Sequence, residues 1–243
     1  MSSSSPAGKA SGAHSPAVKP LQPVAGDASA LSQGMRYAVP PILLAVFAST
    51  FSRLVADPVP TMALNLAVAG GWQVAYCLLC LPVAGASSGA ASRKPRPGEK
   101  KRASDSAGPN MAVAVVLSLV LTLFAVPAVH AAMVLLGAPF LTHTAHTLLC
   151  AAHLAALAFF PLFWTRGVDS AAWLAIAGLR APLDECVGGL VGAAAGAWLG
   201  AVPIPLDWDR EWQKWPVTIL SGMYAGYVLG RVLGGTVLFG KRF

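Results

Sequence analysis

The stretch Gly196–Pro216, GAWLGAVPIPLDWDREWQKWP, links two apolar segments in which glycine recurs at every fourth position. A spacing of four keeps residues on one face of a helix, so each segment presents a stripe that has no side chains. In lipid, such stripes let helix backbones approach closely, because packing replaces the hydrophobic force that lipid cannot supply. The two stripes consist of Gly188, Gly192, Gly196 and Gly200, and of Gly222, Gly226, Gly230 and Gly234.

The numbering of these glycines predicts an antiparallel helical hairpin. If the chain reverses near Asp209, residues at the same depth have numbers that sum to about 418, as judged from the helical rise. This sets Gly188 level with Gly230, and Gly196 level with Gly222. We therefore expect a close contact between the last two helices. The alternative is that glycine is simply common, at 24 of 243 residues, and that each stripe faces another helix.

The composition is that of a protein that crosses a membrane several times. Hydrophobic residues make up 56% of the chain, charged residues only 11%, and the mean hydropathy is +0.62. A soluble domain carries about 25% charged residues, so this chain lacks the charge to cover itself in water. We expect an all-α fold with about six transmembrane helices, each near the ~20 residues that cross the hydrocarbon. The six apolar stretches are 38–56, 62–84, 111–136, 143–164, 183–201 and 216–239.

Two segments lack apolar runs and are rich in small polar residues, glycine and proline. Residues 1–36 are predicted to be a disordered tail, which leaves residues 37–243 as the transmembrane domain. Within that domain, residues 85–110 form a flexible basic loop, and residues 202–215 form a loop rich in tryptophan and proline. Residues 171–179 are too short to span the membrane and are expected to lie at its surface.

Prolines in the apolar stretches predict local features of the helices. Pro40 and Pro41 are expected in the first turn of the first span, where a missing N–H costs nothing. Pro127 in the third span and Pro161 in the fourth predict a kink or an early end of the helix.

The distribution of basic residues predicts the orientation of the chain. Thirteen of the 17 basic residues lie in the N-terminal tail, in loop 85–110, in residues 165–182 or at the C-terminus. By the positive-inside rule, these segments and both termini are cytosolic. Loop 202–215 then faces the opposite compartment. Because the cationic flanks of the spans explain the net charge of +7, no nucleic-acid partner is expected.

Arg231 lies within the last span, where an ionisable residue is a candidate for function. The fifth span begins at the same depth with Asp184 and Glu185, so Arg231 is expected to pair with one of these carboxylates. Alternatively, both acids simply occupy the first helical turn after Pro182, where the helix dipole favours negative charge.

The fourth span carries a seam of His143, His146, Cys150 and His153 within an arc of about 80°. His143 and His146 are weak metal candidates, since His143 and His153 lie about 15 Å apart along the axis. One zinc ion cannot bind histidines at that separation. A polar seam packed against a neighbouring helix is the alternative account. Cys77 and Cys80 form a CxxC without a second pair, so no metal or other cofactor is expected.

The loop at the tip of the hairpin carries most of the functional signal. Its indoles, prolines and mixed charge suit contact with a protein or a lipid head group, whereas plain interfacial anchoring would need less proline and charge. No nucleophile elbow, phosphate-binding loop, dinucleotide fingerprint or HExxH motif occurs, so no catalytic residue is assigned. The candidate contact residues are Pro203, Pro205, Asp207, Trp208, Arg210, Trp212, Trp215 and Pro216.

The stretch Gly196–Pro216, followed by the GxxxGYxxG pattern that starts at Gly222, resembles the signature of the phosphatidylinositol-glycan biosynthesis class F family, including its fungal members. The similarity continues at LLGAPF, residues 135–140, between the third and fourth spans. Family members typically have proline after the arginine of the loop, where this chain has Glu211.

The resemblance implies a multi-pass protein of the endoplasmic reticulum membrane that acts in glycosylphosphatidylinositol (GPI) anchor assembly. Members of that family are non-catalytic partners of the ethanolamine phosphate transferases that modify the mannoses of the anchor. We therefore expect an accessory subunit that binds and stabilises such a transferase, contacts membrane lipid, and places loop 202–215 in the lumen. A small lipid translocator or lipid-binding protein is the alternative, and a membrane enzyme, a third interpretation, would need an acid–base cluster.

Overall fold

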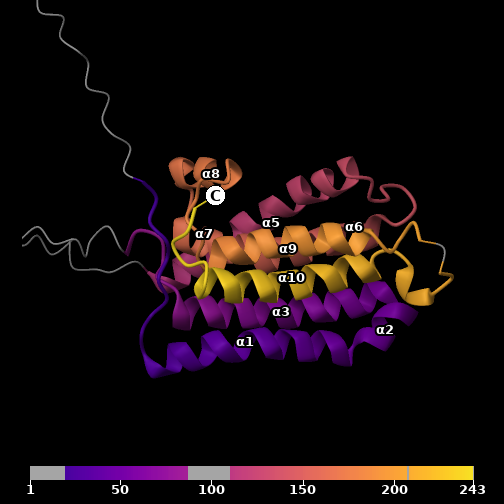
Figure 1. The fold of residues 1–243 in the computed structure, drawn as a ribbon, viewed down its shortest axis with the longest axis horizontal. Coiled ribbons are helices and arrows are strands. Elements are labelled where there is room, and N and C mark those ends of the chain that lie inside the picture. The colour runs from indigo at the N-terminus through magenta and orange to yellow at the C-terminus, as the bar shows by residue number, and fades with distance from the viewer. Residues whose placement is uncertain (1–19, 87–109, 207, 243) are drawn as a thin grey trace, which may run out of the picture.

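The computed structural model describes residues 20–86, 110–206 and 208–242, and within these ranges the chain is all-α, as the sequence predicts. Most of the helices run side by side along the long axis of the molecule (Figure 1). The elements are α1 (Ala30–Ser49), α2 (Phe51–Ala56), α3 (Pro58–Cys80), α5 (Met111–Leu135), α6 (Thr144–Leu154), the π-helical turn η2 (Ala155–Phe159), α7 (Phe160–Arg166), α8 (Ser170–Ala177), α9 (Glu185–Ala201), the 3-10 turn η3 (Glu211–Gln213) and α10 (Val217–Gly235).

Four helical segments of the described residues are long and apolar enough to cross a membrane, which is fewer than the predicted six. They are Pro58–Cys80, Met111–Leu135, Thr144–Arg166 and Val217–Gly235, of which the third joins α6, η2 and α7. Glu185–Ala201 is apolar but only 17 residues long. The first helix carries Ser32, Gln33 and Arg36 in its first two turns, which lowers its hydropathy.

The first helix begins earlier than the sequence predicts, inside the segment assigned to the disordered tail. Ser29 caps it, because its hydroxyl oxygen accepts a hydrogen bond from the Ser32 amide at 3.3 Å. Pro40 and Pro41 consequently lie in the interior of α1 and not in its first turn. Residues 1–19 of the predicted tail, and residues 87–109 of the predicted basic loop, lie outside the described residues.

A proline in the fourth predicted span leaves a helical carbonyl that a polar side chain of another helix then binds. Proline has no N–H, so the carbonyl four residues before it loses its helical partner. Pro161 frees the carbonyl of Leu157 within η2, and Gln73 Nε2 of α3 donates to it at 2.9 Å. The predicted disturbance at Pro161 is thus a π-helical turn, whereas α5 continues as a helix past Pro127 to Leu135.

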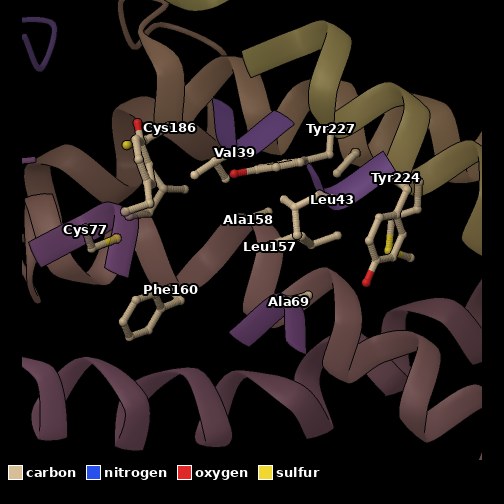
Figure 2. Packing of buried hydrophobic residues seen from close by; sticks show 14 of the residues in the cluster. Val39, Leu43, Ala69, Cys77, Leu157, Ala158, Phe160, Cys186, Tyr224 and Tyr227 are labelled. Atoms are coloured by element: carbon tan, nitrogen blue, oxygen red, sulfur yellow. The ribbon is translucent and has the colours of Figure 1, made fainter. Parts of the chain in front are cut away.

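The core of the bundle combines apolar packing with satisfied polar groups. Leu157 lies among apolar side chains of several helices, and Tyr224 and Tyr227 reach into this core from α10 (Figure 2). Tyr227 accepts a second hydrogen bond from Gln73 Nε2 at 2.7 Å. His153 lies 2.9 Å from the Tyr224 hydroxyl and 3.0 Å from the Met62 carbonyl oxygen. These buried bonds tie α3, α6 and α10 together, because an unpaired polar group in an apolar interior is costly.

The residues that the sequence analysis expects at the membrane surface form α8. It lies at the end of the molecule that also holds the C-terminus (Figure 1). Trp173 of α8 turns toward the bundle, where its ring packs 4.8 Å from that of Phe163 and its indole N–H donates to the Gly167 carbonyl at 2.9 Å.

Replacing Gln73 tests whether the carbonyl freed by Pro161 requires a partner from another helix. We expect Gln73→Leu to lower the free energy of unfolding by roughly 1–3 kcal/mol, because two buried groups lose their donor. Adding Pro161→Ala should recover part of this loss, since alanine supplies the missing N–H. Unfolding midpoints in mild detergent measure both effects. A double variant no more stable than Gln73→Leu alone would refute the account.

Candidate functional site: the glycine hairpin and its two ends

α9 and α10 form an antiparallel hairpin and make the most extensive contact between two helices of the described residues (Figure 1). A Cβ atom added to any of the eight stripe glycines would come within 3.0 Å of backbone atoms of the other helix. The structure places Gly188 against Gly230, and Gly196 against Gly222. These are the pairs that the matched depths predict.

The glycine contacts place backbone directly on backbone. At each stripe position the direction of the missing Cβ points at a carbonyl oxygen of the facing helix, such as Gly226 for Gly192 and Thr218 for Gly200. A glycine Cα–H on this line makes the weak Cα–H···O contact that recurs where helices touch closely. Any larger residue would force the two backbones apart, so the glycine stripes set the separation and the register of the hairpin.

At the open end of the hairpin, the buried Asp184 carboxylate joins three parts of the chain: the segment before α1, α7 and the start of α9. Its Oδ1 caps α9 by accepting from the Cys186 and Val187 amides at 3.0 and 2.9 Å. Its Oδ2 accepts from the Val24 amide and from Arg166 Nη2, both at 2.9 Å. Asp184 is fully buried, so these four bonds replace its hydration.

The neighbouring carboxylate, Glu185, is the partner of Arg231. Arg231 Nε lies 3.6 Å from Glu185 Oε2, and the guanidinium lies over the Tyr76 ring at 3.7 Å from its centroid. Arg36 forms a second ion pair with Glu185, and the Tyr76 hydroxyl donates to it. Arg231 Nη2 also lies 3.5 Å from the Arg36 carbonyl oxygen, which is the carbonyl that Pro40 frees.

We call Asp184, Glu185, Arg36, Arg166 and Arg231 the carboxylate cluster. The depths of the two acids and of Arg231 follow from the sequence, whereas no sequence pattern indicates Arg36, Arg166 or Tyr76. The alternative expectation, that the helix dipole favours acids at the start of the fifth span, also applies to Asp184, because Asp184 caps α9. Breaking a buried ion pair costs far more free energy than breaking an exposed one. The cluster therefore fixes how α1, α7, α9 and α10 pack together.

Gln213 organises the loop at the closed end of the hairpin, and the sequence analysis did not identify it. Its Nε2 donates to the carbonyls of Pro203 and Leu206 at 2.8 and 2.6 Å, and its Oε1 accepts from the Arg210 amide at 3.1 Å. Gln213 is buried, while Lys214 beside it is exposed. A single glutamine carries no repeat or spacing signal, so only the fold reveals this role.

The indoles of the closed end divide into an exposed and a packed set. Trp208 is 52% exposed and Trp198 is 69% exposed, whereas Trp212 and Trp215 pack against the core. The Trp208 and Trp212 rings lie 5.8 Å apart. Of the other predicted contact residues, Pro205 and Arg210 are exposed, Pro203 is half-buried, Pro216 is buried, and Asp207 lies outside the described residues.

The histidine seam of the fourth span does not come together as one site. His143 precedes α6 and its ring lies 5.0 Å from that of His146, whereas His153 is buried against Tyr224 and the Met62 carbonyl. Within the described residues, no group of three or more His, Cys, Asp or Glu side chains could hold a metal ion. The four cysteines are buried and free.

Comparison with known proteins adds a family and several relatives. The model of the GPI biosynthesis protein family Pig-F matches residues 38–235. A Neurospora crassa protein named glycosylphosphatidylinositol anchor biosynthesis protein 11 is 57% identical over 223 residues, which are 92% of this chain and 82% of the relative. A Pyricularia oryzae protein of the same name is 59% identical over 201 residues, which are 82% of this chain and 75% of the relative.

A more distant human relative carries a more specific name. It is called GPI ethanolamine phosphate transferase, stabilizing subunit, and it is 34% identical over 117 residues, which are 46% of this chain and 53% of the relative. No solved structure matches the chain.

A bulky residue in a glycine stripe should open the hairpin. We expect Gly196→Leu to lower the free energy of unfolding by about 3 kcal/mol or more, because the side chain meets backbone and no neighbouring side chain can yield. The neighbour Ala195 is exposed on the same helix, so Ala195→Leu is the matched control and should change stability by less than about 0.5 kcal/mol. Denaturant titration of the detergent-purified chain distinguishes them, and equal stability of the two variants would contradict the packing role.

Proposed function

This chain belongs to the Pig-F family of GPI biosynthesis proteins, and we propose that it is the non-catalytic accessory subunit of an ethanolamine phosphate transferase in GPI anchor biosynthesis. It binds the transferase and stabilises it, and so supports the transfer of ethanolamine phosphate to the mannoses of the anchor. The name of the human relative, a stabilizing subunit of that transferase, is the observation that carries the proposal.

The arrangement of the hairpin supports a role in binding rather than in catalysis. The acids of the open end are buried and held by guanidinium groups and backbone amides, so they are engaged in structure. The closed end presents Pro205, Trp208 and Arg210 on a loop that Gln213 holds in shape. Because Gln213 already fixes the backbone of this loop, the loop itself loses little conformational entropy when a partner binds its exposed indole and guanidinium.

We further propose six membrane crossings with both termini in the cytosol and with loop 202–215 in the lumen of the endoplasmic reticulum. The long helices run along the long axis of the molecule, and α2 and the α9–α10 loop lie at the same end of it (Figure 1). The opposite end holds α8 and the C-terminus (Figure 1). Arg166 of α7, Arg180 after α8, and the C-terminal Lys241 and Arg242 belong to this opposite end. By the positive-inside rule, these basic residues favour the cytosol for it.

Transferase abundance tests the accessory role. In cells that lack their own family member, we expect this chain to restore the steady-state level of the transferase. Trp208→Ala combined with Arg210→Ala should reduce the co-purified transferase several-fold and leave the level of this chain unchanged. Trp198→Ala, which removes an even more exposed indole outside the loop, is the control. Full transferase abundance without this chain would rule out the proposed function.

Glycosylation mapping tests the orientation. A flexible insert with an Asn-Gly-Thr acceptor after Asp209 should acquire a glycan, because transfer of the glycan to the acceptor takes place only on the lumenal side. The same insert between residues 97 and 98 should stay unmodified. Mobility on a gel before and after endoglycosidase treatment gives the answer, and the reverse pattern would overturn the topology.

A further inference from the structure

A groove with an entirely apolar lining lies between α8 and α9, apart from both the carboxylate cluster and the tip loop. Its volume is about 330 Å³, which falls within the range of small-molecule sites. One wall comes from α9 and the other from the C-terminal end of α8 and the turn after it. The lining residues are Ile176, Leu179, Ala181, Val187, Leu190, Val191 and Ala194.

Leu179, which lines this groove, has an unusual backbone conformation. Its φ is 56°, in the left-handed region that favours glycine or asparagine at the end of a helix. The turn is closed by hydrogen bonds from the Arg180 and Ala181 amides to the Ala175 carbonyl at 2.8 and 3.0 Å. Leucine is unfavourable at such a position, yet here its 60% exposed side chain forms a wall of the groove.

The position and charge of the groove match a phospholipid. The lining residues of α9 lie within its first ten residues, which is within about 15 Å of the start of the helix, the thickness of one leaflet of the hydrocarbon. Arg180 lies between two lining residues, is exposed, and forms no ion pair with any other described residue. An acyl chain would fill the apolar groove while the guanidinium binds the phosphate.

The same features argue against other occupants. A transmembrane helix of a partner has a diameter of about 10 Å or more and cannot enter a cavity of this size. A sugar would need polar partners, and the lining supplies none.

We propose that the α8–α9 groove binds one acyl chain of a phospholipid from the leaflet at this end of the bundle, with Arg180 as the contact for its phosphate. This site is independent of the accessory role proposed above.

Lipid retention by the full-length chain tests the proposal. The chain is expressed in membranes, purified in mild detergent, and its bound phospholipid is measured by native mass spectrometry. We expect Ala194→Phe to fill the groove and to reduce bound phospholipid about tenfold. Ala128→Phe places the same side chain on an exposed position of α5 and should leave retention unchanged. Arg180→Gln should reduce retention several-fold, whereas Lys241→Gln, which removes an exposed cation at the same end, should not.

A photoactivatable phospholipid gives a second measurement that does not depend on a variant folding. In the unaltered chain, crosslinks should map to residues 176–194. Crosslinks spread evenly over α5 and the other apolar surfaces would overturn the proposal. Equal phospholipid retention by the Ala194→Phe and Ala128→Phe variants would also overturn it. The same holds if Ala194→Phe keeps its bound phospholipid but no longer co-purifies with the transferase. Failure to stabilise a transferase while lipid is retained would count only against the proposed function.

Discussion

Direct contact between the backbones of α9 and α10 is the constraint on which the rest of the structure depends. Because no side chain separates the two helices along the glycine stripes, their distance and register are both set by the backbone itself. That register brings Arg231 to the level of Glu185 at the open end. At the closed end it leaves only a short distance for residues 202–216 to bridge. Gln213 holds this loop in shape by donating hydrogen bonds to two of its carbonyls.

A second requirement is that polar groups inside an apolar bundle must find partners. Pro40 inside α1 and Pro161 in the first turn of α7 free the carbonyls of Arg36 and Leu157, and Arg231 and Gln73 approach them from other helices. The same reasoning explains why the Asp184 carboxylate takes four hydrogen bonds. These contacts join helices that are distant in sequence, so local breaks in helical bonding become the links of the tertiary structure.

This arrangement suits a protein that acts by binding another protein. The charged residues of the carboxylate cluster at the open end are committed to internal pairs, whereas the exposed groups at the closed end project from a rigid hairpin. A preorganised surface of this kind binds a partner with little ordering cost, as expected for a subunit that stabilises a transferase. The apolar groove beside α8 lies at the other end of the bundle, so lipid and protein contacts can occur independently.

The sequence by itself determined the all-α class, the family and the pairing of the glycine stripes, because spacing along a helix converts directly into depth and face. For the same reason it indicated that Arg231 lies level with Glu185. Only the tertiary structure decided that α1 begins at Ala30, that Arg36 and Arg166 complete the carboxylate cluster, and that Gln73 and Gln213 bind freed carbonyls. Those partners come from separate helices, and no local pattern records which distant groups will meet when helices pack.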